Sequence, residues 1–439
     1  MLSKFKAALA VALALPLLNG CGLDSVNQGD VRLVNATTEY PSLELDTRDS
    51  DGNDTTIVTG VGPGSPSGYA GVDKGDKTFV IKGGTSAGVA AQTTGTISTD
   101  KHYTVVTSIT GNTLTATFLE DEETSPASGN AKLRIFNAAS TEAGGVDVYL
   151  TTTTDCSALQ TTDTALASNV TGLQDTYSQV GATSAGTTWH VCVTETGDKG
   201  NLRLDLPNLS LKDQEIATLI LTRTAGGVLL NASVLEQQGP LTPFTNTISR
   251  VRVIADAASA ATVSANVNGI DLASETSSPV VGAYTTIPTN QSSSVTVSIG
   301  GVQIPGVAPP TLAAGTDYTM LVAGTAGNAT IQFFTDDNTP STSTSAPVKV
   351  RFVNGLNGSS GTASANVDGK LVGSGVAFGS ASTYTTIAAS GANGSTINVS
   401  ASGATVEPLT GQTFNSQSVY TVFLLGDLDT AATSLSQDR

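Results

Sequence analysis

Four times along this chain the same strand-like segment recurs, as Val31-Arg32-Leu33-Val34-Asn35, Leu133-Arg134-Ile135-Phe136-Asn137, Val251-Arg252-Val253-Ile254-Ala255 and Val350-Arg351-Phe352-Val353-Asn354. The starts of these segments are 102, 118 and 99 residues apart, and each interval is the size of one small domain. The 439 residues of the chain are enough for several such cores. The repeat therefore predicts four related modules in tandem rather than one large enzyme fold.

Each copy is followed by further strand signals. In the third and fourth copies the next alternating segment, at 264–269 and 364–369, is nearly identical and ends in Asn-Gly or Asp-Gly, which favours a tight hairpin turn. A closing hairpin then contains a tyrosine, which is Tyr103, Tyr318 or Tyr420. About seven short strands per module, without helical periodicity, are typical of an Ig-like sandwich. We therefore expect an all-β chain of four tandem Ig-like β-sandwich domains, with antiparallel pairing because no crossover helices intervene.

Proline-containing polar segments between the repeats predict the domain boundaries. We expect Ig-like repeats at 30–122, 130–238, 248–336 and 347–430, followed by a C-terminal tail at 431–439. Because the linkers are short and polar, we expect a semi-extended string of modules rather than one merged globule.

The N-terminus carries an export signal. Lys4 and Lys6 precede an apolar stretch, Ala7 to Leu18, that is too short to span a bilayer comfortably but suits a signal peptide. The stretch ends in Leu18-Asn19-Gly20-Cys21, which resembles a bacterial lipobox whose cysteine carries the lipid. We expect a lipoprotein signal peptide at 1–20, lipidation (palmitate included) at Cys21 and a lipidated tether at 21–29. An ordinary secretory signal is the alternative. Gly22, in place of an Asp, points to the outer membrane, facing either the periplasm or the cell surface.

The formal net charge of −17 excludes the basic footprint of a nucleic-acid-binding protein. The expected contacts are therefore the membrane, through the N-terminal lipid, and an unknown protein or glycan.

Two further cysteines, Cys156 and Cys192, form an even pair in a chain that we expect to be exported. A disulfide between them is the default prediction, and it would stabilise the fold by up to roughly 4 kcal/mol on the chain-entropy estimate. His190 would share a strand face with Cys192, but the sequence around it contains no further set of metal ligands.

An acidic segment offers a weak calcium site. Asp49, Asp51 and Asn53 have the alternate spacing of a calcium loop, but Asp54 occupies the position of the loop glycine and Gly60 that of the final glutamate. A hairpin loop stabilised by Asx-turns is the alternative interpretation. We expect no other metal and no cofactor.

One pattern resembles a functional motif. Gly84-Thr85-Ser86-Ala87-Gly88 matches the nucleophile-elbow pattern, but a turn rich in glycine and serine is the simpler interpretation because no helix follows.

The repeated arginine of the first strand (Arg32, Arg134, Arg252, Arg351) alternates with core-facing residues. We expect it to face a neighbouring strand or solvent, where it pairs with a carboxylate or discourages edge-to-edge pairing. We expect the repeated tyrosines of the closing hairpins to pack in the core, with the hydroxyl reaching a backbone partner.

The strand order and its residues resemble a known family. The segment from Leu133 to Ala139 together with Val146 to Tyr149, and the Tyr-Thr-Val closing hairpins, are similar to the exported bacterial "domain of unknown function 4397" family. The resemblance covers most of the mature chain. It implies an Ig-like fold and export, and it implies no activity because the family has no assigned chemistry.

These features favour a non-enzymatic, lipid-anchored cell-envelope protein that projects Ig-like modules for adhesion, assembly or partner binding. An envelope accessory protein that binds carbohydrate or another polymer is the alternative, and it requires an aromatic or Asp/Asn-lined face. A serine hydrolase using Ser86 is a third hypothesis, which reactivity towards a fluorophosphonate probe would support.

Overall fold

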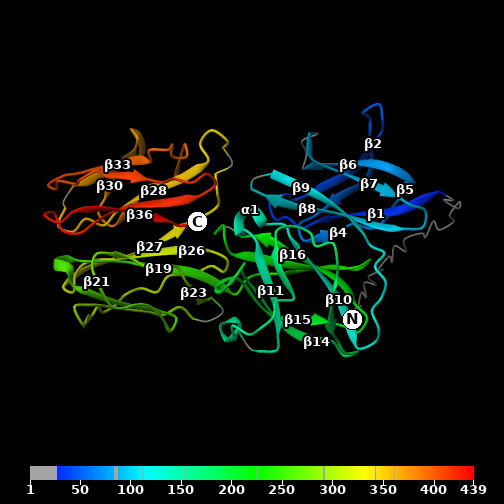
Figure 1. Ribbon diagram of the computed structural model, residues 1–439, viewed down its shortest axis with the longest axis horizontal. Coiled ribbons are helices and arrows are strands. Elements are labelled where there is room, and N and C mark those ends of the chain that lie inside the picture. Colours follow the sequence, from blue (N-terminus) through cyan, green and yellow to red (C-terminus); the bar gives the residue numbers. More distant parts are fainter. Residues whose placement is uncertain are drawn as a thin grey trace, which may run out of the picture.

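The computed structural model describes residues 27–83, 88–111, 113–153, 155–224, 226–289, 292–341, 343–359 and 361–439. The chain forms four successive modules, and each module consists of two β-sheets packed against each other (Figure 1). The predicted all-β architecture of tandem sandwiches is therefore confirmed. In each module the sheet that contains the first strand is called the front sheet, and the other is called the back sheet.

Module 1 has a front sheet of order β4-β1-β8-β9, with β5 also beside β1, and a back sheet of order β3-β2-β6-β7. Its strands are β1 (Gln28–Asn35), β2 (Leu43–Arg48), β3 (Asp54–Val61), β4 (Ser65–Pro66), β5 (Ala70–Asp73), β6 (Gly75–Gly83), β7 (Val89–Ile97), β8 (His102–Thr110) and β9 (Thr113–Glu120).

Module 2 has a front sheet of order β13-β10-β16-β17-β18 and a back sheet of order β12-β11-β14-β15. Its elements are β10 (Asn130–Asn137), α1 (Ser140–Ala143), β11 (Val146–Thr151), η1 (Cys156–Ala158), β12 (Ala167–Val170), β13 (Ser178–Gly181), β14 (Thr187–Glu195), β15 (Asp198–Leu211), β16 (Ile216–Arg223), β17 (Leu230–Glu236) and β18 (Leu241–Phe244). Strand β18 extends this module beyond the expected end at residue 238.

Modules 3 and 4 repeat one plan, with front sheets β22-β19-β26-β27 and β31-β28-β35-β36 and back sheets β21-β20-β24-β25 and β30-β29-β33-β34. Strands β23 and β32 also pair with β19 and β28. Module 3 comprises β19 (Ile248–Ala257), η2 (Ala258–Ala260), β20 (Thr262–Val267), β21 (Ile270–Ser277), β22 (Val280–Val281), β23 (Thr285–Pro288), β24 (Val295–Ile299), β25 (Val302–Gln303), β26 (Asp317–Thr325) and β27 (Asn328–Asp336). Module 4 comprises β28 (Val348–Asn354), β29 (Thr362–Val367), β30 (Lys370–Ala377), β31 (Ser380–Ala381), β32 (Thr385–Ile387), β33 (Ser395–Ala401), β34 (Leu409–Gln412), β35 (Val419–Leu425) and β36 (Ala432–Gln437).

Two expectations about strands are wrong. Residues 431–439 are not a tail, because β36 pairs antiparallel with β35 along its whole length. The sheets are also not purely antiparallel. The first strand of every module runs parallel to the closing strand, in the pairs β1–β8, β10–β16, β19–β26 and β28–β35. The physical reason is that the chain crosses to the back sheet and returns between these two strands, so strands instead of a helix make the crossover.

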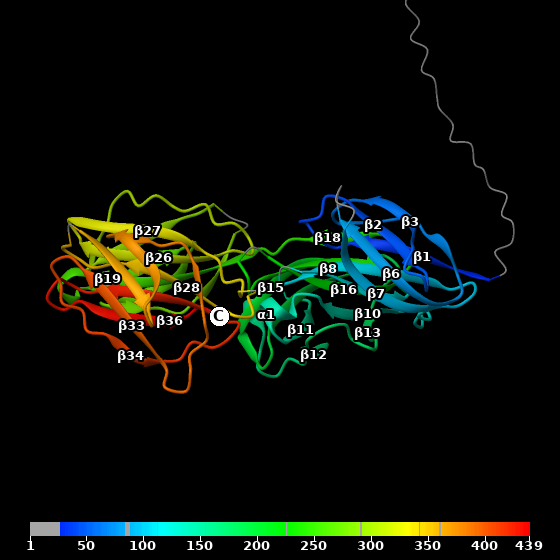
Figure 2. The same ribbon diagram turned by 90° about the horizontal axis from the view of Figure 1, so that it is seen from above.

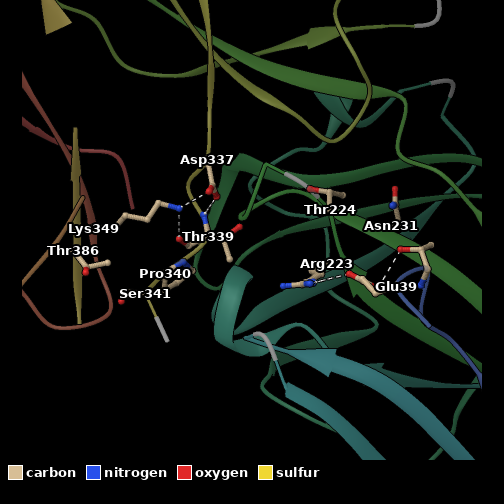
Figure 3. Close-up of a pocket in the computed structure, with 11 residues that line it drawn as sticks. Glu39, Arg223, Thr224, Asn231, Asp337, Thr339, Pro340, Ser341, Lys349 and Thr386 are labelled. Atoms are coloured by element: carbon tan, nitrogen blue, oxygen red, sulfur yellow. Dashed lines mark hydrogen bonds and ion pairs between the residues drawn. The ribbon is translucent and has the colours of Figure 1, made fainter. Parts of the chain in front are cut away.

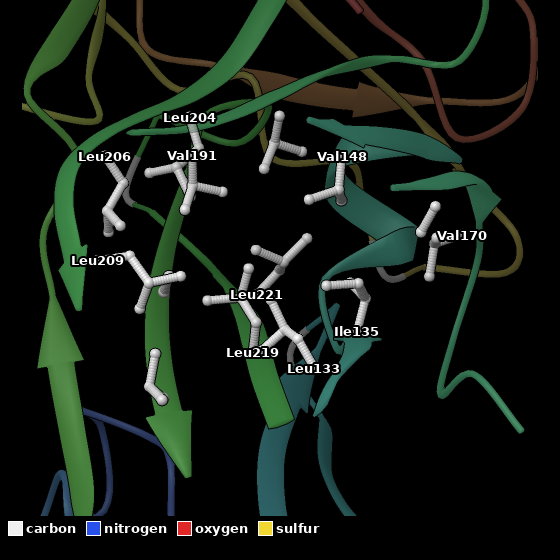
Figure 4. Close-up of a cluster of buried hydrophobic side chains, with 14 of the residues drawn as sticks. Leu133, Ile135, Val148, Val170, Val191, Leu204, Leu206, Leu209, Leu219 and Leu221 are labelled. Atoms are coloured by element: carbon white, nitrogen blue, oxygen red, sulfur yellow. The ribbon is translucent and has the colours of Figure 1, made fainter. Parts of the chain in front are cut away.

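Each module encloses its own hydrophobic core between the two sheets. In module 2 this core is formed by alternate residues of facing strands, including Leu133, Ile135, Val148, Val191 and Leu219 (Figure 4). The same alternation leaves every second residue of the first strand pointing away from the core. Because these outward residues are also buried, something else must cover the front sheet.

The front sheets of neighbouring modules cover each other. Modules 1 and 2 share a second apolar cluster that includes Val34, Val106 and Phe136. Modules 3 and 4 share another, which includes Ile254, Val353 and Phe423. The modules therefore form two face-to-face pairs that lie side by side (Figures 1 and 2). The expected semi-extended string of modules is wrong, because each front sheet exposes apolar side chains that only a second module covers.

Polar contacts of the linker between modules 2 and 3 and of the C-terminal residue join the two pairs. Asn246, 2% exposed, donates from Nδ2 to the carbonyls of Arg203 and Leu230 at 2.9 and 2.8 Å. At the end of the chain, Arg439 donates from Nε to the carbonyl of Glu142 in α1 at 2.5 Å. These contacts fix the second pair against module 2. No helix of the described segments is long and apolar enough to cross a membrane.

Candidate functional site

The repeated arginines lie at the contacts between paired modules. Arg252 and Arg351 are each 1–2% exposed, although they point away from the core of their own module. Each arginine is paired in register with a threonine of the parallel strand β26 or β35. Thr319 accepts a hydrogen bond from Nε of Arg252 at 2.9 Å, and Thr421 accepts one from Nε of Arg351 at 3.1 Å. The expectation that this arginine faces a neighbouring strand and pairs with a carboxylate is confirmed at Arg252 and Arg351. The alternatives, that it faces solvent or discourages pairing at a sheet edge, are wrong there because the partner module covers it.

Modules 3 and 4 exchange their ion pairs reciprocally. Arg252 of module 3 pairs with Asp438 of module 4 at 2.5 Å, and Arg351 of module 4 pairs with Asp336 of module 3. All four side chains are at most 2% exposed. Burial lowers the pKa of the Arg252 guanidinium, but the combined effects of Asp438, Tyr284 and Asp336 outweigh it, so this pKa lies above its ordinary value. We call these four residues the reciprocal ion-pair cluster.

Modules 1 and 2 use an asymmetric version of the same contact. Nη2 of Arg32 lies 3.6 Å from Asp121 of its own module, and its guanidinium also donates to the carbonyls of Glu236 and Gly239 in module 2. Arg134 of module 2 bonds Thr218 and lies over the ring of Tyr177, with 4.5 Å between Cζ and the ring centroid. The interface therefore keeps the arginines but has fewer exchanged ion pairs.

Tyrosines that the sequence did not single out as contacts complete these interfaces. Tyr284 stacks under Arg252 at 4.6 Å and donates to Asp336 at 2.6 Å, and Tyr384 lies 5.1 Å from Arg351. Their recurrence as Tyr-Thr-Thr-Ile was the available signal. A cation over a tyrosine ring stabilises by about 2 kcal/mol when it is desolvated.

The tyrosines of the closing hairpins lie where the sequence predicted. Each is buried, and its hydroxyl accepts a hydrogen bond from the backbone N–H five residues upstream, at 3.0 Å for Tyr103, 3.0 Å for Tyr318 and 2.9 Å for Tyr420. This arrangement resembles the tyrosine corner of Ig-like sandwiches.

The predicted disulfide is confirmed. Cys156 in η1 and Cys192 in β14 are bonded, with 5.5 Å between their Cα atoms. His190 lies on the same face of β14, and its Nε2 is 2.5 Å from Oδ1 of Asp205 in β15. Among the described residues, Cys156, Cys192 and His190 are the one group of three metal-type ligands that converge, and here both sulfurs are in the disulfide.

The weak calcium candidates lie at the tip of the β2–β3 hairpin. Oδ1 of Asp49 accepts hydrogen bonds from the backbone N–H groups of Asp51 and Asn53 at 2.9 and 2.8 Å. The hydrogen bonds from Asn53 lower the pKa of Asp49. This is the Asx-turn geometry of the alternative interpretation. Cys21 and Ser86, the lipidation and nucleophile candidates, both lie outside the described residues.

A polar pocket of about 620 Å³ lies at the waist of the molecule, where modules 1, 2 and 4 meet the linker between modules 3 and 4 (Figure 3). We call it the waist pocket. Its lining residues carry mostly hydroxyl, amide and charged groups: Thr38, Glu39, Arg223, Thr224, Asn231, Asp337, Thr339, Pro340, Ser341, Lys349 and Thr386.

Two ion pairs hold opposite walls of the waist pocket. Arg223 of β16 bonds Glu39 at 2.8 Å, and Lys349 of β28 bonds Asp337 at 2.7 Å. Burial raises the pKa of Glu39, but the hydrogen bond and charge of Arg223 together with the backbone hydrogen bonds from Thr38 and Glu39 outweigh it, so this pKa lies below its ordinary value. Burial lowers the pKa of Lys349, against the opposing effect of Asp337. The pocket can hydrogen-bond a polar ligand.

Comparison with known proteins supports the sequence resemblance over part of the chain. Residues 29–149 match the family model described as "Domain of unknown function (DUF4397)". This DUF4397 match covers module 1 and the first strands of module 2, whereas the sequence suggested a resemblance along most of the chain. No curated protein sequence matches the chain significantly.

Two solved structures are similar to about half of the chain. One is described as a "putative cell adhesion protein" of Bacteroides uniformis, with 9% identity, a TM-score of 0.20, and coverage of 48% of this chain and 99% of that one. The other is a family 26 carbohydrate-binding module of Eubacterium rectale in complex with maltoheptaose, with 11% identity, a TM-score of 0.16, and coverage of 47% and 96%. Likenesses at these scores carry no functional argument.

Proposed function

We propose that this chain is a non-enzymatic, lipid-anchored cell-envelope protein that presents paired Ig-like modules for adhesion, assembly or partner binding. One observation carries the proposal. The charged residue that recurs in every module, and that could have formed a shared ligand site, is buried against the partner module at Arg252 and Arg351. At these two positions the repeated arginine therefore stabilises the contact between modules and is not available to a ligand.

The paired architecture suits a presenting role. Face-to-face pairing through apolar clusters and buried ion pairs fixes the relative orientation of the modules, and the buried Asn246 linker fixes one pair against the other. A preordered body loses little conformational entropy when a partner binds to its outer surfaces.

The anchor follows from the sequence. Cys21 ends a signal-peptide-like segment, and β1 begins at Gln28. A tether of this length reaches no more than roughly 25 Å when extended. On this proposal the modules lie close to the membrane, most simply the outer membrane, and face either the periplasm or the medium.

The anchor is tested by labelling cells with a palmitate analogue. Cys21→Ser should abolish labelling and release the protein from the membrane fraction, and unchanged labelling in that variant would contradict the anchor. Protease treatment of intact cells then distinguishes the two sides of the membrane. Loss of cell aggregation on deletion of the gene, restored by the wild-type chain, would support adhesion.

Binding of a carbohydrate or another polar polymer is the second candidate, and the waist pocket favours it through its hydroxyl and charged groups. A binding face built on aromatic stacking lacks support, because every aromatic side chain of the described residues is buried or half-buried. Binding of envelope polysaccharide to the wild type, lost in Asn231→Leu, would favour this role over adhesion to a protein partner.

A further inference from the structure

A second cavity, of about 720 Å³, lies between module 2 and module 3. Its module 2 side is formed around η1 and β15, and its module 3 side by β19, β21 and β23. We call it the disulfide cavity because Cys156 lines it. The volume lies in the range of about 300–1,000 Å³ that is typical of small-molecule sites.

The walls of the disulfide cavity are mainly apolar. Cys156, Leu202 and Ile248 belong to one buried cluster and are only 4–8% exposed. Leu159 packs against this cluster, and Pro288 lines the cavity from module 3. Because residues from two modules form these walls, the fixed orientation of the two pairs also fixes the shape of the cavity.

One wall residue sets this module apart from its nearest copy. Ile270 follows the Asn-Gly turn of module 3, is 36% exposed and lines the cavity. At the same register position in module 4, where the preceding six residues are nearly identical, the chain has the exposed Lys370. The β-hairpin itself therefore tolerates a lysine here, and the isoleucine occurs in the copy that faces the cavity.

Three charged side chains line the cavity, one ammonium group and two carboxylates. Nζ of Lys199 is engaged with the carbonyls of Gln160, Thr161 and Asp163 at 2.7, 3.0 and 2.6 Å. The carboxylates of Asp155 and Asp205 also line the cavity. Oδ1 of Asp205 lies 2.5 Å from Nε2 of His190, and Oδ1 of Asp155 accepts a hydrogen bond from the backbone N–H of Ser157 at 2.9 Å, so each carboxylate keeps its Oδ2 for a ligand. A mainly apolar cavity with two carboxylates in its lining complements a ligand with an apolar body and a cationic group.

We propose that the disulfide cavity binds a small apolar molecule that carries a protonated amine. The site is independent of the adhesive role proposed above. It requires the walls from both modules, the apolar side chain of Ile270 and the carboxylate of Asp205.

The experiment measures binding of 1-naphthylmethylamine to the purified full chain by isothermal titration calorimetry, with 1-naphthylmethanol as the neutral counterpart. The expected result is saturable binding of one amine per chain, with the alcohol at least tenfold weaker. Ile270→Lys should weaken amine binding at least tenfold, and Asp205→Asn about fivefold. Val302→Lys is the matched control, because Val302 is an exposed residue of the same module outside the cavity, and it should bind as the wild type does.

Three results would overturn the proposal. These are no saturable amine binding by the wild type at millimolar concentration, equal binding of amine and alcohol, or equal binding by Ile270→Lys and Val302→Lys. If Ile270→Lys fails to fold, as judged by its thermal transition, the comparison of amine with alcohol on the wild type still decides the question.

Discussion

The reciprocal ion-pair cluster makes a strong prediction about stability. Asp438→Asn keeps the shape of the side chain but removes the charge that faces Arg252 at 2.5 Å. Both side chains are at most 1% exposed, so solvent cannot replace the lost partner. Breaking a buried pair by removal of one partner costs about 3–5 kcal/mol, because it leaves an uncompensated charge.

This loss should appear in the transition of modules 3 and 4. For a unit of this size, each kcal/mol lowers Tm by about 2–4 °C, so the expected shift is about 10 °C. Differential scanning calorimetry of the whole chain measures it, and Asp429→Asn, at an exposed residue of the same module, is the matched control.

A second variant separates the charge effect from lost packing. The double variant Asp438→Asn/Arg252→Met removes both charges and should recover at least half of the lost stability. If Asp438→Asn shifts Tm no more than Asp429→Asn does, the ion pair does not hold the modules together and the reasoning is refuted.

Three further predictions concern a buried carboxyl group, a tyrosine hydroxyl and the disulfide. Burial raises the pKa of Asp256 from 3.8 to about 7, so the folded state binds the proton more tightly, and stability should fall as pH rises from about 4 to 7; Asp256→Asn should remove this fall, as measured by urea unfolding at a series of pH values. Tyr318→Phe removes the hydroxyl that accepts from the backbone of Ala313 and should cost about 1–2 kcal/mol in the same assay, whereas an unchanged midpoint would contradict the role of that bond. Reduction of Cys156–Cys192 should cost up to about 4 kcal/mol, and non-reducing peptide mapping should recover the linked pair, whereas two free thiols would disprove the bond.

The strands and their buried contacts were predictable because they depend on local pattern. The alternation of apolar and polar residues predicted that Val31 and Leu33 lie in a core. The repeated hairpin tyrosines predicted hydrogen bonds to the backbone, and the even pair of cysteines predicted the disulfide. The pairing of modules was not predictable. Alternation shows that Arg252 points away from its own core, but it does not show that a second module covers it.

The last strand and the waist pocket were missed for different reasons. β36 has one large apolar residue, Leu435, and pairs mainly through its backbone, so it gives no alternation signal. The waist pocket joins Glu39 to Arg223 across 184 residues of sequence and brings the linker residue Asp337 to Lys349. Only the face-to-face arrangement brings these side chains together.

The pairing of modules can be measured directly by small-angle X-ray scattering of the purified chain. Two compact face-to-face pairs predict a radius of gyration below about 30 Å, whereas four modules in an extended row predict roughly 45 Å. A value near the lower figure, unchanged by salt, is the result expected from apolar contacts and buried ion pairs. A value near the upper figure would contradict the paired architecture on which the proposed function depends.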